Sequence, residues 1–225
     1  MKDKPYINAV GALMYISVAT RSDIAHTVGV LCRFNANPGP HYWKAVLHLF
    51  RYLQGTKDLK LTFTPTSSPE LFTTYSDADH GGNPDNGKST TGYALKMGTG
   101  VVSWSSKLQP LVALSTTEAE YVAATSSGSE CLWMRSLFTE LGYDMSKSSL
   151  MCLDNQSALT VAKNPEHHGR MKHMDLRYFW LRDVVEKGLI RLEYIPTDDM
   201  VADILTKSLH RLKVLEAQKQ LGLFR

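Results

Sequence analysis

Several features are scarce in this sequence, and each absence excludes a class of protein. Its 225 residues include only three cysteines and no CxxC pair, so neither a disulfide framework nor a zinc ribbon is indicated. No apolar run approaches the roughly 18 to 20 residues of a membrane-spanning helix, and the charged start leads into no signal-peptide core. A net charge of +3 does not by itself indicate a nucleic-acid partner. We therefore expect a soluble intracellular protein with no membrane contact.

What the sequence does contain is typical of a globular protein with two parts. Apolar residues recur at helical spacing over residues 6–34, with an interruption at 20–23, and again over 42–53, which predicts three helices. A stretch rich in proline and serine follows at 65–69. The sequence thus predicts an all-helical segment over residues 1–60 and a second domain over residues 66–225.

Period-two patterns and turn residues predict a run of strands and then alternating helices and strands. The expected strands are 59–64, 71–76, 92–97, 101–105, 150–153 and 190–195, and the expected helices are 116–141, 157–163, 174–187 and the tail from 201. Cys131 and Trp133 are expected to pack the long helix against the sheet. This order predicts an α/β fold with a mixed five-stranded sheet flanked by helices.

Four acidic residues stand where this order of elements brings them to one edge of the sheet. Asp77 ends a strand, Glu120 lies on the long helix, Asp154 ends a later strand and Asp203 opens the last helix. The three aspartates each have an ordinary alternative: Asp77 in a solvated turn, Asp154 as a helix N-cap, and Asp203 as a favourable charge at a helix start. Only their combination indicates a metal site.

The long helix offers two glutamates, and local physics separates them. Ser115 and Glu118 match a capping box, in which the glutamate reaches back to the amide of the capping serine. Glu120 points away from Glu118, and its stripe continues through the small residues Ala124 and Gly128, which leave room for a ligand. Glu120 is therefore the predicted site glutamate.

Six motifs then occur in one order between residues 75 and 209: YSDADHGG, KSTTGYAL, VVSWSSKLQPLVALSTTEAEYVAA, CLDNQSA, HHGRMKHMDLRYFWLRD and TDDMVADILTKSL. Together they resemble the C-terminal region of the Pol polyprotein of copia-type LTR retrotransposons. Residues 6–56 resemble the thumb or connection segment that precedes its ribonuclease H domain. The resemblance implies a ribonuclease H-like fold that hydrolyses the RNA strand of RNA–DNA hybrids endonucleolytically. It also implies, as a partner, the upstream polymerase palm and fingers, in a cytoplasmic virus-like particle or the nucleus.

The same resemblance implies a role for each acid. Asp77 would bridge two Mg²⁺ ions, for which Mn²⁺ can substitute, Glu120 and Asp154 would complete the shell of one ion, and Asp203 would hold the other. The family usually has tryptophan where His80 stands. The carboxylate motif of a reverse transcriptase is absent, so no polymerase activity is expected from this chain.

Weaker predictions concern the substrate. Glu120, Asn155 and Gln156 are candidates for reading the RNA 2′-hydroxyl. The basic segment 167–173 suits phosphate contacts as well as plain solvation, and better than a zinc site; its candidates are His168, Arg170, Lys172 and His173, the histidines also for proton transfer or product release.

Two further interpretations concern the chain as a whole. In the helical segment before residue 60, basic residues outnumber acidic ones, so it is expected to contribute affinity rather than chemistry. The alternative function is a non-catalytic nucleic-acid-binding or interaction module left from a degraded or domesticated element.

Overall fold

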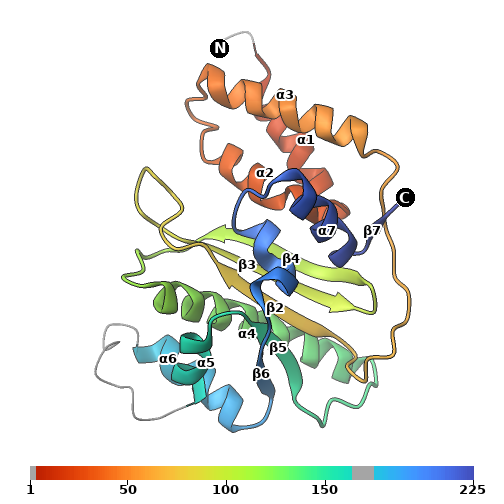
Figure 1. Cartoon of the computed structure of the whole chain (residues 1–225), viewed down its shortest axis with the longest axis vertical. Coiled ribbons are helices and arrows are strands. Elements are labelled where there is room, and N and C mark those ends of the chain that lie inside the picture. Colours follow the sequence, from red (N-terminus) through yellow and green to blue (C-terminus); the bar gives the residue numbers. More distant parts are fainter. Residues whose placement is uncertain (1–3, 164–174) are drawn as a thin grey trace.

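A computed structural model of the chain describes residues 4–163 and 175–225, with side chains in the second range from residue 179 onward. Its centre is a five-stranded sheet with the order β4-β3-β2-β5-β6 (Figure 1). The strands are β2 (Thr73–Ala78), β3 (Thr90–Met97), β4 (Gly100–Leu108), β5 (Ser149–Leu153) and β6 (Ile190–Tyr194). β2, β3 and β4 form an antiparallel meander, whereas β5 and β6 run parallel to β2. The predicted mixed sheet is confirmed.

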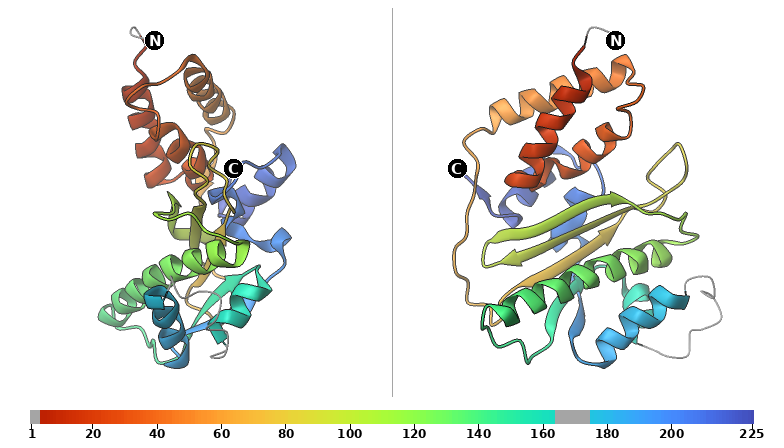
Figure 2. Two further views of the ribbon diagram at one scale, coloured as in Figure 1. Left: turned by 90° about the vertical axis from the view of Figure 1, so that its left-hand side faces the viewer. Right: turned by 180° about the vertical axis from the view of Figure 1, so that it is seen from behind.

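Helices cover both faces of this sheet (Figure 2). The helix α4 (Thr116–Glu140) lies across β2 and β3, with α5 (Gln156–Lys163) and α6 (Asp175–Glu186) beside it, while the 3-10 helix η4 (Val201–Leu205) packs on β2 and β3 from the other face. Cys131 is buried between α4 and the sheet as expected, but Trp133 is 57% exposed, so that prediction was wrong. Side chains two positions apart on an α-helix point about 200° apart around its axis, so Cys131 and Trp133 cannot both face the sheet.

The N-terminal segment is helical, as predicted, and has a core of its own. It consists of α1 (Tyr6–Ala19), the 3-10 helix η1 (Ser22–Ile24), α2 (Ala25–Cys32) and α3 (Pro40–Gly55). The indole Nε1 of Trp104 on β4 donates to the Ser17 carbonyl at 3.0 Å, and the Gln218 amide donates to the Tyr52 hydroxyl at 2.6 Å. These bonds attach the segment to the edge of the sheet and to the C-terminal helix. The domain boundary near residue 66 stays a prediction.

Two predicted elements near the chain ends are corrected. The strand expected over 59–64 is only β1 (Lys60–Leu61), because its partner is the equally short β7 (Leu223–Phe224) and not the main sheet. The tail is not continuously helical: η4 is followed by α7 (Arg211–Gln220) and then by β7. Gly222 makes this turn with φ +84°, and a Cβ there would lie 2.5 Å from Gly100 Cα, so the tail runs in backbone contact with β4.

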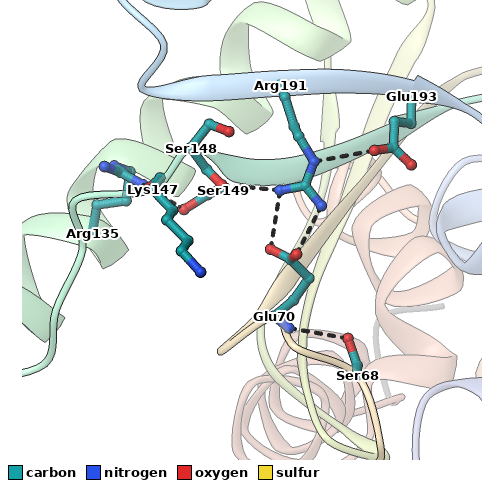
Figure 3. A network of polar contacts seen from close by, with 8 residues as sticks. All are labelled: Ser68, Glu70, Arg135, Lys147, Ser148, Ser149, Arg191 and Glu193. Atoms are coloured by element: carbon teal, nitrogen blue, oxygen red, sulfur yellow. Dashed lines mark hydrogen bonds and ion pairs between the residues drawn. The ribbon is translucent and has the colours of Figure 1, made fainter.

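Polar contacts hold the linker before β2 at the edge where β5 and β6 begin (Figure 3). The Arg191 guanidinium donates to both oxygens of Glu70, at 2.8 and 3.2 Å, and to the Ser148 carbonyl at 3.0 Å. The Glu70 amide in turn donates to Ser68 Oγ at 3.2 Å. The network fixes the end of the sheet at which β5 and β6 begin. Asp77 and Asp154 lie at the opposite end, where β2 and β5 finish. Among the described residues, no helix has the length and apolar character needed to cross a membrane.

Candidate metal site at the strand ends

Three of the four predicted carboxylates meet at one point. Asp77, Glu120 and Asp154 each offer an oxygen, and these oxygens all lie within 4.8 Å of one another. Asp77 is near the end of β2 and Asp154 directly follows β5. Because these two strands are parallel neighbours, their carboxyl ends reach the same edge, and the first turns of α4 pass beside it.

The start of α4 separates its two glutamates. Ser115 caps the helix, and its hydroxyl accepts the Glu118 amide at 3.1 Å. The Glu118 carboxylate accepts a hydrogen bond from the backbone amide of Leu114 at 2.7 Å. Leu114 precedes the capping residue Ser115, whose amide was the predicted donor. Glu118 therefore serves the helix terminus, and Glu120 is the glutamate that joins Asp77.

The small residues on α4 have a different role from the predicted one. A Cβ on Gly128 would lie 3.3 Å from the Trp180 ring and 3.4 Å from Leu181, both on α6, and Ala124 is fully buried in the core. The small-residue stripe therefore admits α6 and not a ligand. A sequence pattern cannot distinguish a neighbouring helix from a bound ligand, because both need small side chains at these positions.

The N-cap alternative for Asp154 is settled by its neighbour. Asn155 Oδ1 accepts the Ala158 amide at 2.9 Å and so caps α5. The Asp154 carboxylate instead accepts the Thr197 hydroxyl at 2.8 Å and faces the other acids. Capping therefore engages the side-chain oxygen of Asn155, one of the residues predicted to read the 2′-hydroxyl. Gln156, another of these residues, is exposed beside it.

The fourth acid, Asp203, lies within the 3-10 helix η4 and not at the start of an α-helix, which corrects its predicted setting. Lys207 Nζ stands 2.7 Å from Asp203 Oδ1 and 4.0 Å from Asp77 Oδ2. The Thr206 hydroxyl donates to the Asp77 carboxylate. Sequence reasoning did not single out Thr206 and Lys207, although both lie in the motif TDDMVADILTKSL.

Gly92 explains how η4 comes so close to Asp77. It stands opposite Asp77 in the β2–β3 register. A Cβ at this position would lie 2.6 Å from Thr206 Cγ2 and 2.9 Å from Leu205 Cβ, closer than atoms can approach without movement. The absent side chain therefore allows Thr206 and the residues around it to reach the site.

Burial makes this cluster electrostatically costly. It raises the pKa of Asp77 to about 6, although Lys207 acts in the opposite direction. Burial, reinforced by Asp77 and Asp154, raises the pKa of Glu120 to about 9. Burial also raises the pKa of Asp203. For Lys207, burial lowers the pKa, but Asp77 and Asp203 outweigh it and raise the pKa overall.

The donor set fits a divalent cation. Glu120 Oε2 is buried and has no hydrogen-bond partner among the described residues, so one ligand atom is already desolvated and uncommitted. Several carboxylate oxygens in one small volume are the ligands that Mg²⁺ and Mn²⁺ prefer. A bound cation would also relieve the repulsion that disfavours ionisation of Glu120 and Asp77.

The remaining candidates are placed less fully. His168, Arg170, Lys172 and His173 lie outside the described residues. His80 lies in the loop after β2, where its ring Nε2 is 3.3 Å from the carbonyl oxygen of Ala113.

Sequence comparisons place the chain among mobile-element proteins. It is 45% identical over 223 residues to the retrovirus-related Pol polyprotein of transposon TNT 1-94 from Nicotiana tabacum, covering 99% of this chain and 17% of that protein. Identity to the Pol polyprotein of transposon RE2 from Arabidopsis thaliana is 37%, covering 98% and 15%. This chain thus spans less than a fifth of these polyproteins. The secreted RxLR effector protein 161 of Plasmopara viticola is 46% identical over 134 residues, covering 60% of this chain and 94% of the effector.

No protein-family model matches the chain. Among solved structures, the N-terminal ribonuclease H domain of rv2228c from Mycobacterium tuberculosis matches with a TM-score of 0.43 and 15% identity, covering 65% of this chain and 94% of that one. LC11-RNase H1 in complex with an RNA/DNA hybrid matches with a TM-score of 0.43 and 16% identity, covering 60% and 93%.

Proposed function

Because the chain belongs to the family of retrovirus-related Pol polyproteins of copia-type transposons, we propose that it carries a ribonuclease H that cuts the RNA strand of RNA–DNA hybrids. The observation that supports this most directly is the meeting of Asp77 and Asp154, at the ends of the parallel strands β2 and β5, with Glu120 of α4. These three acids are the ones that the motifs YSD, TEAE and CLD assign to the site.

The four carboxylates would hold two Mg²⁺ ions. Asp77, Glu120 and Asp154 would supply ligands from one cluster, and Asp203 would add the fourth carboxylate. When bound, such ions would supply Lewis-acid chemistry, lowering the pKa of an attacking water and stabilising the leaving 3′ oxygen. The products would carry 5′-phosphate and 3′-hydroxyl ends.

The chain's own residues prepare the site for these ions. The Thr206 hydroxyl orients Asp77 through its hydrogen bond, and the Thr197 hydroxyl does the same for Asp154. Lys207 supplies positive charge beside Asp203 and Asp77. If a metal bound Asp203, the Lys207 ammonium would give up its contact with the Asp203 oxygen. It would remain close enough to contact a phosphate.

The direct test is incubation of the purified protein with Mg²⁺ and a hybrid labelled on the RNA strand. We expect cleavage of the hybrid, no cleavage of a DNA duplex of the same sequence, and loss of cleavage in Asp77→Asn. Glu118→Gln is the matched control, because Glu118 lies two residues from Glu120 yet serves the helix cap. Equal loss of activity in Glu118→Gln and Glu120→Gln, with unchanged helicity, would contradict the assignment.

A second candidate is a non-catalytic interaction module. The Plasmopara viticola effector favours it, because nearly all of that protein matches part of this chain at 46% identity, so related segments occur outside polyproteins. The same hybrid assay separates the two functions. Binding of the hybrid without cleavage in either Mg²⁺ or Mn²⁺ would support the module.

A further inference from the structure

A large cleft opens between the N-terminal helices and the tail of the chain. Its volume is about 870 Å³, and it is lined by α2 and α3 on one side and by η4, residues 207–209 and α7 on the other. Neither part of the chain forms the cleft alone. It exists because the helical segment is attached to the tail, in part through the hydrogen bond from Gln218 to Tyr52.

Basic side chains stand on both sides of this cleft, among apolar ones such as Leu49 and Ile204. Lys44, His48 and Arg51 line it from α3, all exposed and at spacings of four and three residues, so they form one stripe along the helix. Lys207 faces them from the other side, with its side chain 41% exposed.

Three further titratable side chains line the cleft, and none of them offsets the charges of Lys44 and Arg51. Burial raises the pKa of Tyr52, so its hydroxyl stays neutral. Burial lowers the pKa of His26 to about 4, with a further contribution from Arg33, so His26 is neutral near pH 7. The side chain of Asp23 is fully buried, accepts two bonds from Arg21 at 2.7 and 2.9 Å, and accepts the Tyr52 hydroxyl at 2.5 Å. Its charge is thus neutralised inside the protein.

The cleft and the carboxylate site share one side chain, Lys207. It lines the cleft and also contacts Asp203 at 2.7 Å. A nucleic-acid duplex carries about one negative charge per 1.7 Å of its axis, and its backbone necessarily extends beyond the reacting phosphate. A cleft that carries cationic side chains and shares Lys207 with the carboxylate site complements such a backbone.

We propose that this cleft binds the phosphate backbone of the hybrid away from the scissile bond, with Lys44 and Arg51 of α3 as phosphate contacts. The inference rests on the proposed function and assigns the helical segment to the substrate-binding surface. Because these contacts are made to phosphates, they confer affinity without sequence preference.

The test compares the full-length chain with two double variants of equal charge. K44Q/R51Q removes two cations of the cleft, and K147Q/K187Q removes two exposed cations just before β5 and β6, at the opposite edge of the sheet. Hybrid binding is measured in Ca²⁺ across a salt series. Each lost phosphate contact reduces the slope of log affinity against log salt by about 0.7 to 0.9, so K44Q/R51Q should be shallower by about 1.4 to 1.8. K147Q/K187Q should keep the slope of the unaltered chain.

Hybrid length provides a second readout. On a hybrid of two helical turns, K44Q/R51Q should raise KM and leave kcat nearly unchanged. On a hybrid shorter than one turn, about 10 base pairs, the KM difference should shrink, because the duplex no longer fills both the cleft and the carboxylate site. A general folding defect would affect both lengths equally.

The outcomes separate this inference from the proposed function. If the unaltered chain cleaves the hybrid and both double variants bind it alike, the cleft is not a phosphate site and the ribonuclease proposal survives. If K44Q/R51Q alone weakens binding while no protein cleaves at any Mg²⁺ concentration, the cleft is supported and the activity is refuted. Failure of the unaltered chain to bind hybrid overturns both.

Discussion

Replacement of Glu120 by glutamine should stabilise the protein in the absence of metal. Glu120 is only 6% exposed, and burial together with Asp77 and Asp154 raises its pKa from 4.5 to about 9. The folded state therefore holds a proton on Glu120 at pH values where the unfolded chain releases it. A neutral amide of nearly the same shape avoids this cost.

The size of the effect follows from the pH range between the unfolded and folded pKa values of Glu120. Between pH 4.5 and about 9, each pH unit costs the unaltered protein about 1.4 kcal/mol of unfolding free energy if Glu120 titrates alone. Neighbouring acids share the cost and the buried amide loses hydrogen bonds to water, so we expect Glu120→Gln to gain about 1 to 3 kcal/mol near pH 8. The gain should vanish near pH 4.5, where both states are protonated.

Urea unfolding in chelator at pH 5 and pH 8.5 measures this difference. Glu118→Gln is the control, and we expect no comparable gain that grows with pH, because Glu118 lies at the helix cap and outside the acidic cluster. Added Mg²⁺ should then stabilise the unaltered protein more than Glu120→Gln, since a ligand stabilises the state that binds it. An equal or lower stability of Glu120→Gln at pH 8.5 in chelator would refute the reasoning.

Three further predictions follow from the site and its surroundings. Mg²⁺ and Mn²⁺ should support hydrolysis, whereas Ca²⁺ should permit hybrid binding with little turnover because its looser shell holds two oxygens poorly in line; full activity in excess chelator would contradict this. Gly92→Ala should push η4 away from Asp77 and lower both kcat and thermal stability, by about 1 to 3 kcal/mol for the latter; an unchanged melting temperature would show that η4 yields easily. His26 should contribute a loss of stability as pH falls from 6.5 towards 4, because the unfolded chain protonates His26 before the folded one does, and this loss opposes the gain expected from Glu120; His26→Gln should therefore gain stability relative to the unaltered protein as pH falls through this range, measured by denaturant unfolding at each pH.

The sheet and the meeting of Asp77, Glu120 and Asp154 were predictable from the order of the elements, whereas the setting of Asp203 in a 3-10 helix was not. Alternating strands and turn residues, followed by alternating helices and strands, allow few ways to cover a sheet. The choice of Glu120 over Glu118 followed from the capping pattern at Ser115, and the structure places both residues accordingly. The roles of the four acids in catalysis stay a proposal.

Other features depend on contacts that a sequence does not display. Asp154 and Asn155 are both good capping residues, and only the backbone at the start of α5 selects Asn155. Gly128 leaves a space whose occupant, Trp180, comes from a helix some 50 residues later. The pairing of Lys207 with Asp77 depends on how η4 lies on the sheet, which Gly92 determines.

The distance along the chain between Asp77 and its partners has a consequence for the timing of activity. Thr206, whose hydroxyl bonds to Asp77, is made 129 residues later, which takes roughly 6 to 26 s at about 5 to 20 residues per second. Until then a growing chain has the helical segment and most of the sheet, but lacks Asp203 and Lys207. Ribosome-bound chains arrested before residue 200 should accordingly leave a hybrid intact, while those that expose residue 210 should cut it. Under the proposed function, the acidic site is complete only after residue 207 has been made, so cleavage by a growing chain should begin only then.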